Sequence, residues 1–149
     1  STSVASGDGR ALNRSLLFTP AGKIVARYDK IHLFDVQLGQ GEAYRESATF
    51  APGDKAVLAN GPMDAKLGLT ICYDVRFAPL YQSLAGAGAE ILFVPAAFTK
   101  PTGEAHWEIL LRARAIETGA YVVAPAQGGL HEDGRTTFGR TLMVDPWGA

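Results

Sequence analysis

An α/β fold is predicted by the alternation of helices with buried strands in the second half of the chain. A helix expected over 79–87 begins with proline and is followed by glycine at 88. The apolar run 90–95 comes next, and a second expected helix, 104–118, is followed by the apolar run 121–125. Continuous apolar runs of this length are typical of strands buried on both faces of a sheet. A helix followed by a buried strand thus occurs twice, which is the pattern of α/β proteins.

Short strands account for most of the other ordered structure that we expect. Each is an apolar run next to Gly, Pro or Asn residues that favour a turn. The runs lie at 15–18, 23–28, 56–58, 65–71 and 141–144. The first two flank a Pro- and Gly-containing turn and predict a hairpin, and the next two flank Asn-Gly-Pro and predict a second pair.

Three segments are expected to be irregular. Residues 1–11 are rich in Ser, Gly and Asp and predict a flexible start, with ordered structure beginning near Asn13. The glycine-rich stretch 127–134 predicts a turn. Residues 35–54 follow no period and contain four glycine or proline residues, at 39, 41, 52 and 53. A loop of this length inside a compact domain is usually functional, so 35–54 is a candidate active-site loop.

Composition argues against several classes of function. Lys and Arg number 14 and Asp and Glu 15, so the formal charge is −1 and no basic field is expected to attract nucleic acid or a membrane surface. The apolar run 91–98 is too short to span a bilayer. The single cysteine excludes an internal disulfide and favours the reducing cytoplasm, and the scattered histidines show no metal-ligand spacing. Neither a metal nor another cofactor is expected.

The functional interpretation depends on Cys72. It follows the predicted strand 65–71 and precedes a polar turn, and the carboxyl ends of strands are where open α/β sheets place reactive groups. A helix N-terminus and a cation nearby would favour its thiolate, which is the nucleophilic form. A lone cysteine in an apolar strand is more often a small buried hydrophobe. A Cys/His hydrolase would use His32 or His106, each of which also fits as an ordinary polar residue, so the spacing leaves these alternatives open.

Three successive motifs resemble those of the nitrilase, or carbon–nitrogen hydrolase, superfamily. They are YDKIHLFD at 28–35, YRES at 44–47 and GLTICYDVRF at 68–77, and the similarity continues to VDPWG at 144–148. Within the superfamily the chain is most similar to the deaminated-glutathione amidases and omega-amidases, which hydrolyse primary amides of short dicarboxylate-like compounds. The resemblance implies that 12–149 is an incomplete carbon–nitrogen hydrolase domain with part of an α/β/β/α sandwich.

The resemblance also implies a set of site residues. The catalytic set of the family is Glu, Lys and Cys, with a second Glu beside them. The Lys corresponds to Lys30, the second Glu to Glu46 and the Cys to Cys72, whereas the first Glu has no counterpart. Amide hydrolysis builds an oxyanion, which the Lys30 ammonium and the backbone N–H after the nucleophile would stabilise. Lys30 is also expected to lower the pKa of the Cys72 thiol, and Glu46 to hold Lys30 in place. The candidates for oxyanion or substrate contacts are Tyr73, Ala97 and His106.

Other residues in the motifs are expected to be structural. Asp74 is expected to pair with Arg76, and Trp107 to lie in the core. Ion pairs on the second helix are expected to involve Arg112, Arg114 and Glu117.

The family joins two sandwiches into a dimer, so a homodimer is expected at full length, with Leu80, Tyr81 and Leu84 in the contact patch.

The sequence therefore predicts a hydrolase of non-peptide carbon–nitrogen bonds. Its expected substrates are small primary amides that carry a carboxylate, with nitriles left open, and its expected intermediate is a thioester on Cys72. The chain begins at Ser1 and stops after a turn signal, so we expect a piece truncated at both ends and inactive alone. The alternative is a non-catalytic fragment or degenerate member that acts as a binding or dimerisation module.

Overall fold

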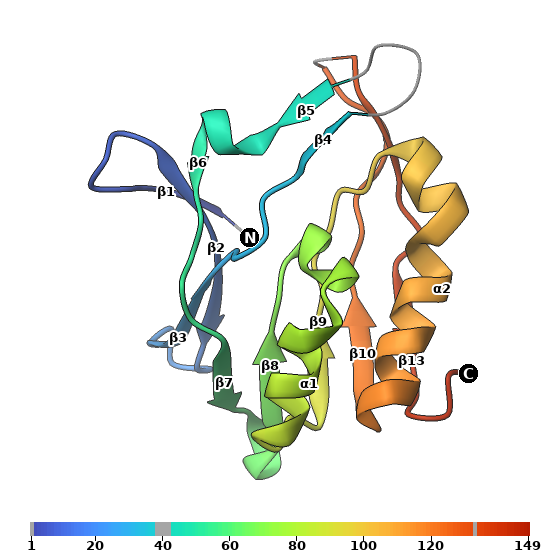
Figure 1. Cartoon of the computed structure of the whole chain (residues 1–149). Helices are drawn as coiled ribbons and strands as arrows, with labels where there is room; N and C mark the ends of the chain where they lie inside the picture. Colours follow the sequence, from blue (N-terminus) through green and yellow to red (C-terminus); the bar gives the residue numbers. More distant parts are fainter. Residues whose placement is uncertain (1, 38–42, 133) are drawn as a thin grey trace.

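A computed structural model describes residues 2–37, 43–132 and 134–149 (Figure 1). The described chain has a larger five-stranded sheet, a smaller four-stranded sheet, two two-stranded hairpins and two α-helices. The larger sheet has the strand order β13-β10-β9-β8-β7. Its strands are β7 (Val57–Asn60), β8 (Lys66–Leu69), β9 (Ile91–Phe93), β10 (Tyr121–Ala124) and β13 (Leu142–Val144). The central three strands are parallel, and the two outer strands are antiparallel to their neighbours. The predicted α/β fold is confirmed.

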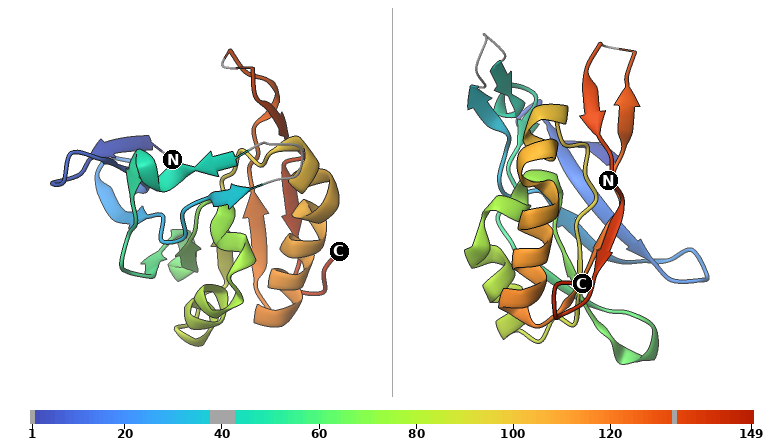
Figure 2. Two further views of the ribbon diagram at one scale, coloured as in Figure 1. Left: turned by 45° about the horizontal axis from the view of Figure 1, so that its top comes forward. Right: turned by 90° about the vertical axis from the view of Figure 1, so that its right-hand side faces the viewer.

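Both helices cover the same face of this sheet (Figure 2). Helix α1 (Ala78–Gly86) follows the short 3-10 helix η4 (Cys72–Arg76), and helix α2 (Lys100–Thr118) follows β9. Helix α2 starts four residues before the predicted start at 104, because Pro101 fits a first turn and Gly103 is accommodated inside the helix. A Cβ atom at Gly103 would lie 2.3 Å from the Cβ atom of Phe138, so the close approach requires glycine. Neither helix of the described chain has both the length and the apolar character needed to cross a bilayer.

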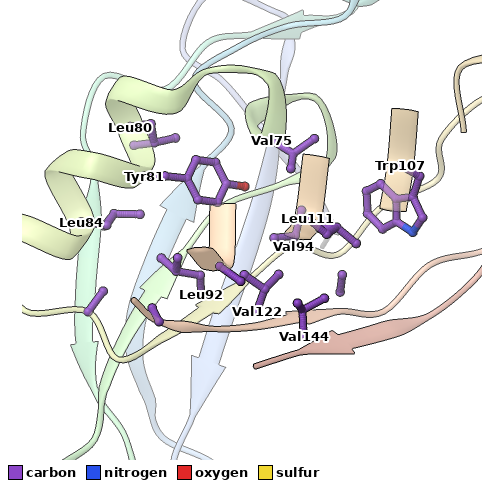
Figure 3. Packing of buried hydrophobic residues seen from close by; sticks show 14 of the residues in the cluster. Val75, Leu80, Tyr81, Leu84, Leu92, Val94, Trp107, Leu111, Val122 and Val144 are labelled. Carbon is purple, nitrogen blue, oxygen red and sulfur yellow. The ribbon is translucent and has the colours of Figure 1, made fainter. Parts of the chain in front are cut away.

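The main core lies between the helices and the sheet (Figure 3). Trp107 and Leu111 of α2 are fully buried there against strand residues, which confirms Trp107 as a core residue. The prediction that the apolar residues of α1 form part of an exposed contact patch is wrong. These residues belong to the core because they face the sheet; they are Leu80, Tyr81 and Leu84.

The smaller sheet contains the predicted hairpin. Strands β2 (Ala11–Phe18) and β3 (Ile24–Asp29) pair antiparallel, and β6 (Phe50–Ala51) pairs with β2 in parallel. Strand β1 (Thr2–Ala5) pairs with the other edge of β2, so the prediction of an irregular start is wrong for these residues. Their side chains stay largely exposed, and backbone hydrogen bonds form the strand without any apolar pattern in the sequence.

Two hairpins project beyond the carboxyl ends of the central strands (Figures 1 and 2). One pairs β4 (Asp35–Gln37) with β5 (Ala43–Arg45), and the other pairs β11 (Gly128–Leu130) with β12 (Thr136–Phe138). The predictions of irregular structure at 35–54 and 127–134 are therefore wrong for these strands, although 38–42 and 133 lie outside the described residues. Two further 3-10 turns are η2 (Glu46–Ala48) and η3 (Pro62–Asp64).

Candidate active site

A cavity of about 790 Å³ lies at the carboxyl ends of the three parallel strands. The segment after β8 contributes Cys72, the segment after β9 contributes 95–98, and the segment after β10 contributes 125–127. Side chains at the carboxyl ends of parallel strands meet at one edge of the sheet, which is where α/β proteins usually bind ligands. The predicted position of Cys72 at such a strand end is confirmed.

The opposite wall of the cavity comes from the chain between β3 and β6. Lys30 lies just after β3 and Glu46 begins η2, and both line the cavity together with Cys72. These three residues are far apart in the sequence, and the structure brings them together as predicted. Of the other predicted site residues, Tyr73 and Ala97 also line the cavity.

His106 lies elsewhere. It is exposed on α2, outside the cavity lining, and its Nδ1 atom lies 3.3 Å from the Arg76 Nη2 atom. His32 is also absent from the lining, and its Nδ1 atom lies 2.8 Å from the Oδ1 atom of Asp74. The structure therefore does not bring either histidine to Cys72 as a Cys/His pair.

Lys30 is only 2% exposed and forms an ion pair with Glu46. The Oε2 atom of Glu46 also accepts the backbone N–H of Phe34 at 2.6 Å, and its Oε1 atom lies 3.5 Å from the Nδ2 atom of Asn13. Burying an ammonium group is costly unless a partner compensates its charge. Glu46 supplies that partner and fixes the direction of the Lys30 side chain.

Asn13 was missed as a site residue by sequence reasoning. It lines the cavity, and its carbonyl oxygen accepts the backbone N–H of Lys30 at 2.9 Å. The signal that could have found it is the register of the predicted hairpin. In the structure Arg14 pairs with Asp29, so the next residues along the two strands are Asn13 and Lys30.

Cys72 sits in a strained turn. Its φ is +49°, in the left-handed region that non-glycine residues seldom adopt. Its backbone N–H donates to the carbonyl oxygen of Pro95 at 2.9 Å, which ties the end of β8 to the end of β9. Such backbone conformations cost on the order of 1–3 kcal/mol and cluster at functional sites. The strain is an independent reason to regard Cys72 as functional.

The environment of Cys72 raises the pKa of its thiol. Burial is the largest influence, and the Glu46 and Asp74 carboxylates act in the same direction. The Lys30 ammonium and the Ala97 backbone N–H act in the opposite direction but do not compensate for burial. The expectation that Lys30 lowers the pKa of the Cys72 thiol is therefore confirmed in direction, but burial outweighs this influence and the pKa is raised overall. Formation of the thiolate would thus require a base.

A family model described as carbon-nitrogen hydrolase matches residues 2–149. The chain belongs to the carbon–nitrogen hydrolase family. The deaminated glutathione amidase of Synechocystis sp. is 51% identical over 146 residues, which are 97% of this chain and 54% of that protein. The chain thus spans about half the length of the curated relatives that it matches, and the family match begins before the domain start predicted at 12.

Solved structures share the fold of this carbon–nitrogen hydrolase chain. The NitFhit protein of C. elegans is 42% identical with a TM-score of 0.89, over 97% of this chain and 36% of that one. A variant of the amidase from Nesterenkonia sp. AN1 shows acrylamide bound by Michael addition at its active-site cysteine. That amidase is 28% identical with a TM-score of 0.81, over 99% of this chain and 55% of that one. The prediction of a carbon–nitrogen hydrolase fold is confirmed.

The expected pair between Asp74 and Arg76 is wrong. Asp74 is fully buried behind the turn, whereas the Arg76 guanidinium lies over the rings of Tyr73 and Phe98, 5.9 and 5.6 Å from their centroids. Side chains two positions apart in a helical turn point in different directions, so the two charges do not meet. In this hydrolase-family chain, Asp74 instead accepts hydrogen bonds from the segment around Lys30.

Ion pairs of α2 hold the helix and the turn in place. Arg114 pairs with Glu117 at 2.6 Å and donates through Nε to the carbonyl oxygen of Val75 at 2.9 Å. Arg112 pairs with Glu108 at 3.0 Å, one turn earlier in the helix. The prediction of structural ion pairs on this helix is confirmed, and the Arg114 bond links α2 directly to the turn that begins with Cys72.

Proposed function

We propose that this chain carries the nucleophile of an amidase that hydrolyses small primary amides, with Cys72 attacking the amide carbonyl. One observation carries the proposal: Cys72 and the buried Lys30–Glu46 ion pair line a single cavity at the carboxyl edge of the parallel strands. Because the chain spans about half of its curated relatives, the activity and substrates of the whole protein are part of the proposal.

The proposed reaction has two halves. The Cys72 thiolate adds to the carbonyl carbon, and the oxyanion that forms is stabilised by the Lys30 ammonium and the backbone N–H of Tyr73. The base returns the proton taken from the thiol to the amide nitrogen, and collapse of the intermediate then breaks the C–N bond, releases ammonia and leaves a thioester on Cys72. Water then hydrolyses the thioester, which releases the carboxylic acid and returns the thiol.

Proton transfer limits what the described residues can do alone. The raised pKa of the Cys72 thiol requires a base, and the Glu46 carboxylate is already occupied by Lys30 and the Phe34 N–H. Neither Asp8 nor Asp29, the acids that precede Lys30, lines the cavity. We therefore propose that the base is the first Glu of the family set, supplied from outside these 149 residues.

The proposed substrate is a small amide that also carries a carboxylate. Arg45 and Arg135 also line the cavity, and a guanidinium group can bind a substrate carboxylate through charge-assisted hydrogen bonds. The relative named deaminated glutathione amidase supports the same class of reaction. A cytoplasmic location and a homodimer of the whole protein stay predictions from the sequence.

The acylation half of the reaction can be tested on the 149-residue chain. An activated ester, succinic acid mono-p-nitrophenyl ester, loses nitrophenolate, a leaving group that needs no proton, whereas an amide nitrogen must be protonated before it leaves. At pH 9 we expect one equivalent of nitrophenolate per chain and a matching succinyl mass on Cys72, with neither in Cys72→Ala. Lys30→Met should slow acylation by roughly 10²–10³, as loss of one oxyanion donor does.

The surface variant Lys100→Met is the matched control, because Lys100 is exposed and outside the cavity. The double variant Lys30→Met/Glu46→Gln does not leave a buried carboxylate uncompensated. It tests the contribution of Lys30 to acylation if the single variant does not fold. Acylation of the Lys30 variants as fast as the control would contradict the proposed role of Lys30. Acylation of the folded chain no faster than that of the urea-unfolded chain would contradict the proposed function.

A further inference from the structure

Asp74 is a fully buried carboxylate that accepts four hydrogen bonds. Its Oδ1 atom accepts the backbone N–H of His32 at 3.0 Å and lies 2.8 Å from the His32 Nδ1 atom. Its Oδ2 atom accepts the Tyr28 hydroxyl at 2.6 Å and the backbone N–H of Ile71 at 2.9 Å. Because a carboxylate only accepts, the imidazole N–H of His32 is placed on Nδ1. Both oxygens of Asp74 are thus fully used.

The partners of Asp74 surround the proposed catalytic lysine. Tyr28 and His32 lie two residues before and two residues after Lys30, and the Tyr28 hydroxyl also accepts the backbone N–H of Ile31 at 3.3 Å. Asp74 itself lies two residues after Cys72. One carboxylate therefore connects both sides of Lys30 to the turn that begins with Cys72.

This connection matters because the two catalytic candidates belong to different sheets. Lys30 follows β3 of the smaller sheet, whereas Cys72 follows β8 of the larger one. The ring of His32 also stacks on Phe77, the residue after η4, with centroids 3.7 Å apart and planes 8° from parallel. The contacts of Asp74 and His32 thus join the two sheets directly beside the cavity.

We propose that Asp74 is a positioning residue that sets the placement of the Lys30 ammonium relative to the Cys72 sulfur. Its catalytic consequence rests on the proposed amidase function, but the placement itself does not. Asp74 is absent from the cavity lining, so it acts through Tyr28, His32 and the turn rather than by touching substrate.

The charge of Asp74 and its positioning of Lys30 should have opposite effects on the rate of Cys72 acylation, so an experiment can separate them. The Asp74 charge contributes to the raised pKa of the Cys72 thiol. If charge were its main contribution, Asp74→Asn would make the thiol easier to ionise and would speed acylation. If positioning dominates, acylation slows because the Lys30 ammonium is no longer held over the reacting carbonyl.

The test compares Asp74→Asn and Tyr28→Phe with Asp64→Asn, an exposed carboxylate control in η3. The first readout is the maximal rate of Cys72 acylation by succinic acid mono-p-nitrophenyl ester, with folding checked by thermal melting. We expect Asp74→Asn to slow acylation at least tenfold, Tyr28→Phe to slow it less, and Asp64→Asn to leave it unchanged. Tyr28→Phe keeps the Asp74 charge and removes one of its hydrogen bonds, so it tests the positioning role if Asp74→Asn does not fold.

A second readout does not depend on amidase chemistry. The pH midpoint of Cys72 alkylation by iodoacetamide should move up in Lys30→Met, because the nearby cation is lost. In the Asp74→Asn background the same change should move the midpoint less, since Lys30 is already displaced. Equal shifts in the two backgrounds, or unchanged acylation in folded Asp74→Asn, would overturn the positioning role. If the unchanged chain is not acylated, that result would count against the proposed function but not against the positioning role of Asp74, which the iodoacetamide readout tests separately.

Discussion

The backbone N–H of Cys72 and the carbonyl oxygen of Pro95 form a 2.9 Å hydrogen bond that joins the ends of two parallel strands. This bond holds Cys72 in a left-handed conformation with φ of +49°. The sulfur is therefore carried on a short, strained turn at the edge of the sheet. Four consequences of this turn and of its neighbours can be measured.

The first prediction concerns the strain at Cys72. Glycine adopts a positive φ without steric cost, whereas alanine does not. Cys72→Gly should therefore be more stable than Cys72→Ala by about 1 kcal/mol, the lower end of the usual cost of such a conformation. Urea denaturation of both variants gives the comparison. A glycine variant that is less stable than the alanine variant would show that the turn is not strained.

The second prediction concerns the ion pair of Lys30 and Glu46. Removing one partner of a buried pair leaves an uncompensated charge and costs roughly 3–5 kcal/mol. Lys30→Met should lose stability of this order, and Lys30→Met/Glu46→Gln should regain part of it. Denaturant unfolding of both variants and of Lys100→Met measures the difference. Equal stabilities of the single and double variants would mean that Glu46 is solvated without Lys30.

The third prediction concerns alkaline pH. Burial raises the pKa values of Cys72, Tyr28 and Tyr81. A group whose pKa is higher in the folded state stabilises it fully below the unfolded pKa, and this contribution is lost as the pH rises through the folded pKa. The free energy of unfolding should thus fall as the pH rises beyond about 8.5, the ordinary value for cysteine.

The contribution of Cys72 to this pH dependence can be isolated. Cys72→Ala removes one of the three groups, so its stability should fall less steeply between pH 8 and 10 than that of the unchanged chain. Urea denaturation at several pH values measures both slopes. Parallel curves would show that the thiol titrates alike in the folded and unfolded states.

The fourth prediction concerns turnover of amides. Loss of a general base usually reduces the rate by about 10²–10⁴, and residues that act as one unit lose most of their effect together. The 149-residue chain should therefore release little ammonia from succinamate even where Cys72 is acylated by the activated ester. An ammonia assay with Cys72→Ala as the blank tests this. Ready turnover would identify Glu46 or another group of this chain as the base.

Prediction from sequence succeeded where hydrophobic patterning and motifs carried the information. The strand before Cys72 and both helices are defined by apolar residues that the structure buries, and Trp107 is fully buried as expected. The motifs around Lys30, Glu46 and Cys72 placed three distant residues in one cavity. Patterning of this kind works because burial of apolar area dominates the free energy of folding.

Prediction failed where backbone pairing or long-range polar contacts decide the structure. Strand β1 and the hairpin of β4 and β5 leave most of their side chains exposed, so composition carried no strand signal. The hydrogen-bond partners of Asp74 lie more than 40 residues away in the sequence, except for Ile71. The expected ion-pair partner, Arg76, is close in the sequence but does not pair with Asp74. Burial was also underestimated at Cys72, where it outweighs the charge of Lys30 in setting the thiol pKa.

The placement of Lys30 and Cys72 on different sheets links the chemistry to the order of folding. Lys30 and Cys72 follow strands of different sheets, and they are 42 positions apart in the sequence. Closing a long loop costs conformational entropy that is compensated only once the distant residues pack together. We therefore expect a refolding chain to form its local strands and helices before the two sheets pack. The influence of Lys30 on the Cys72 thiol would then report on the packing of the two sheets.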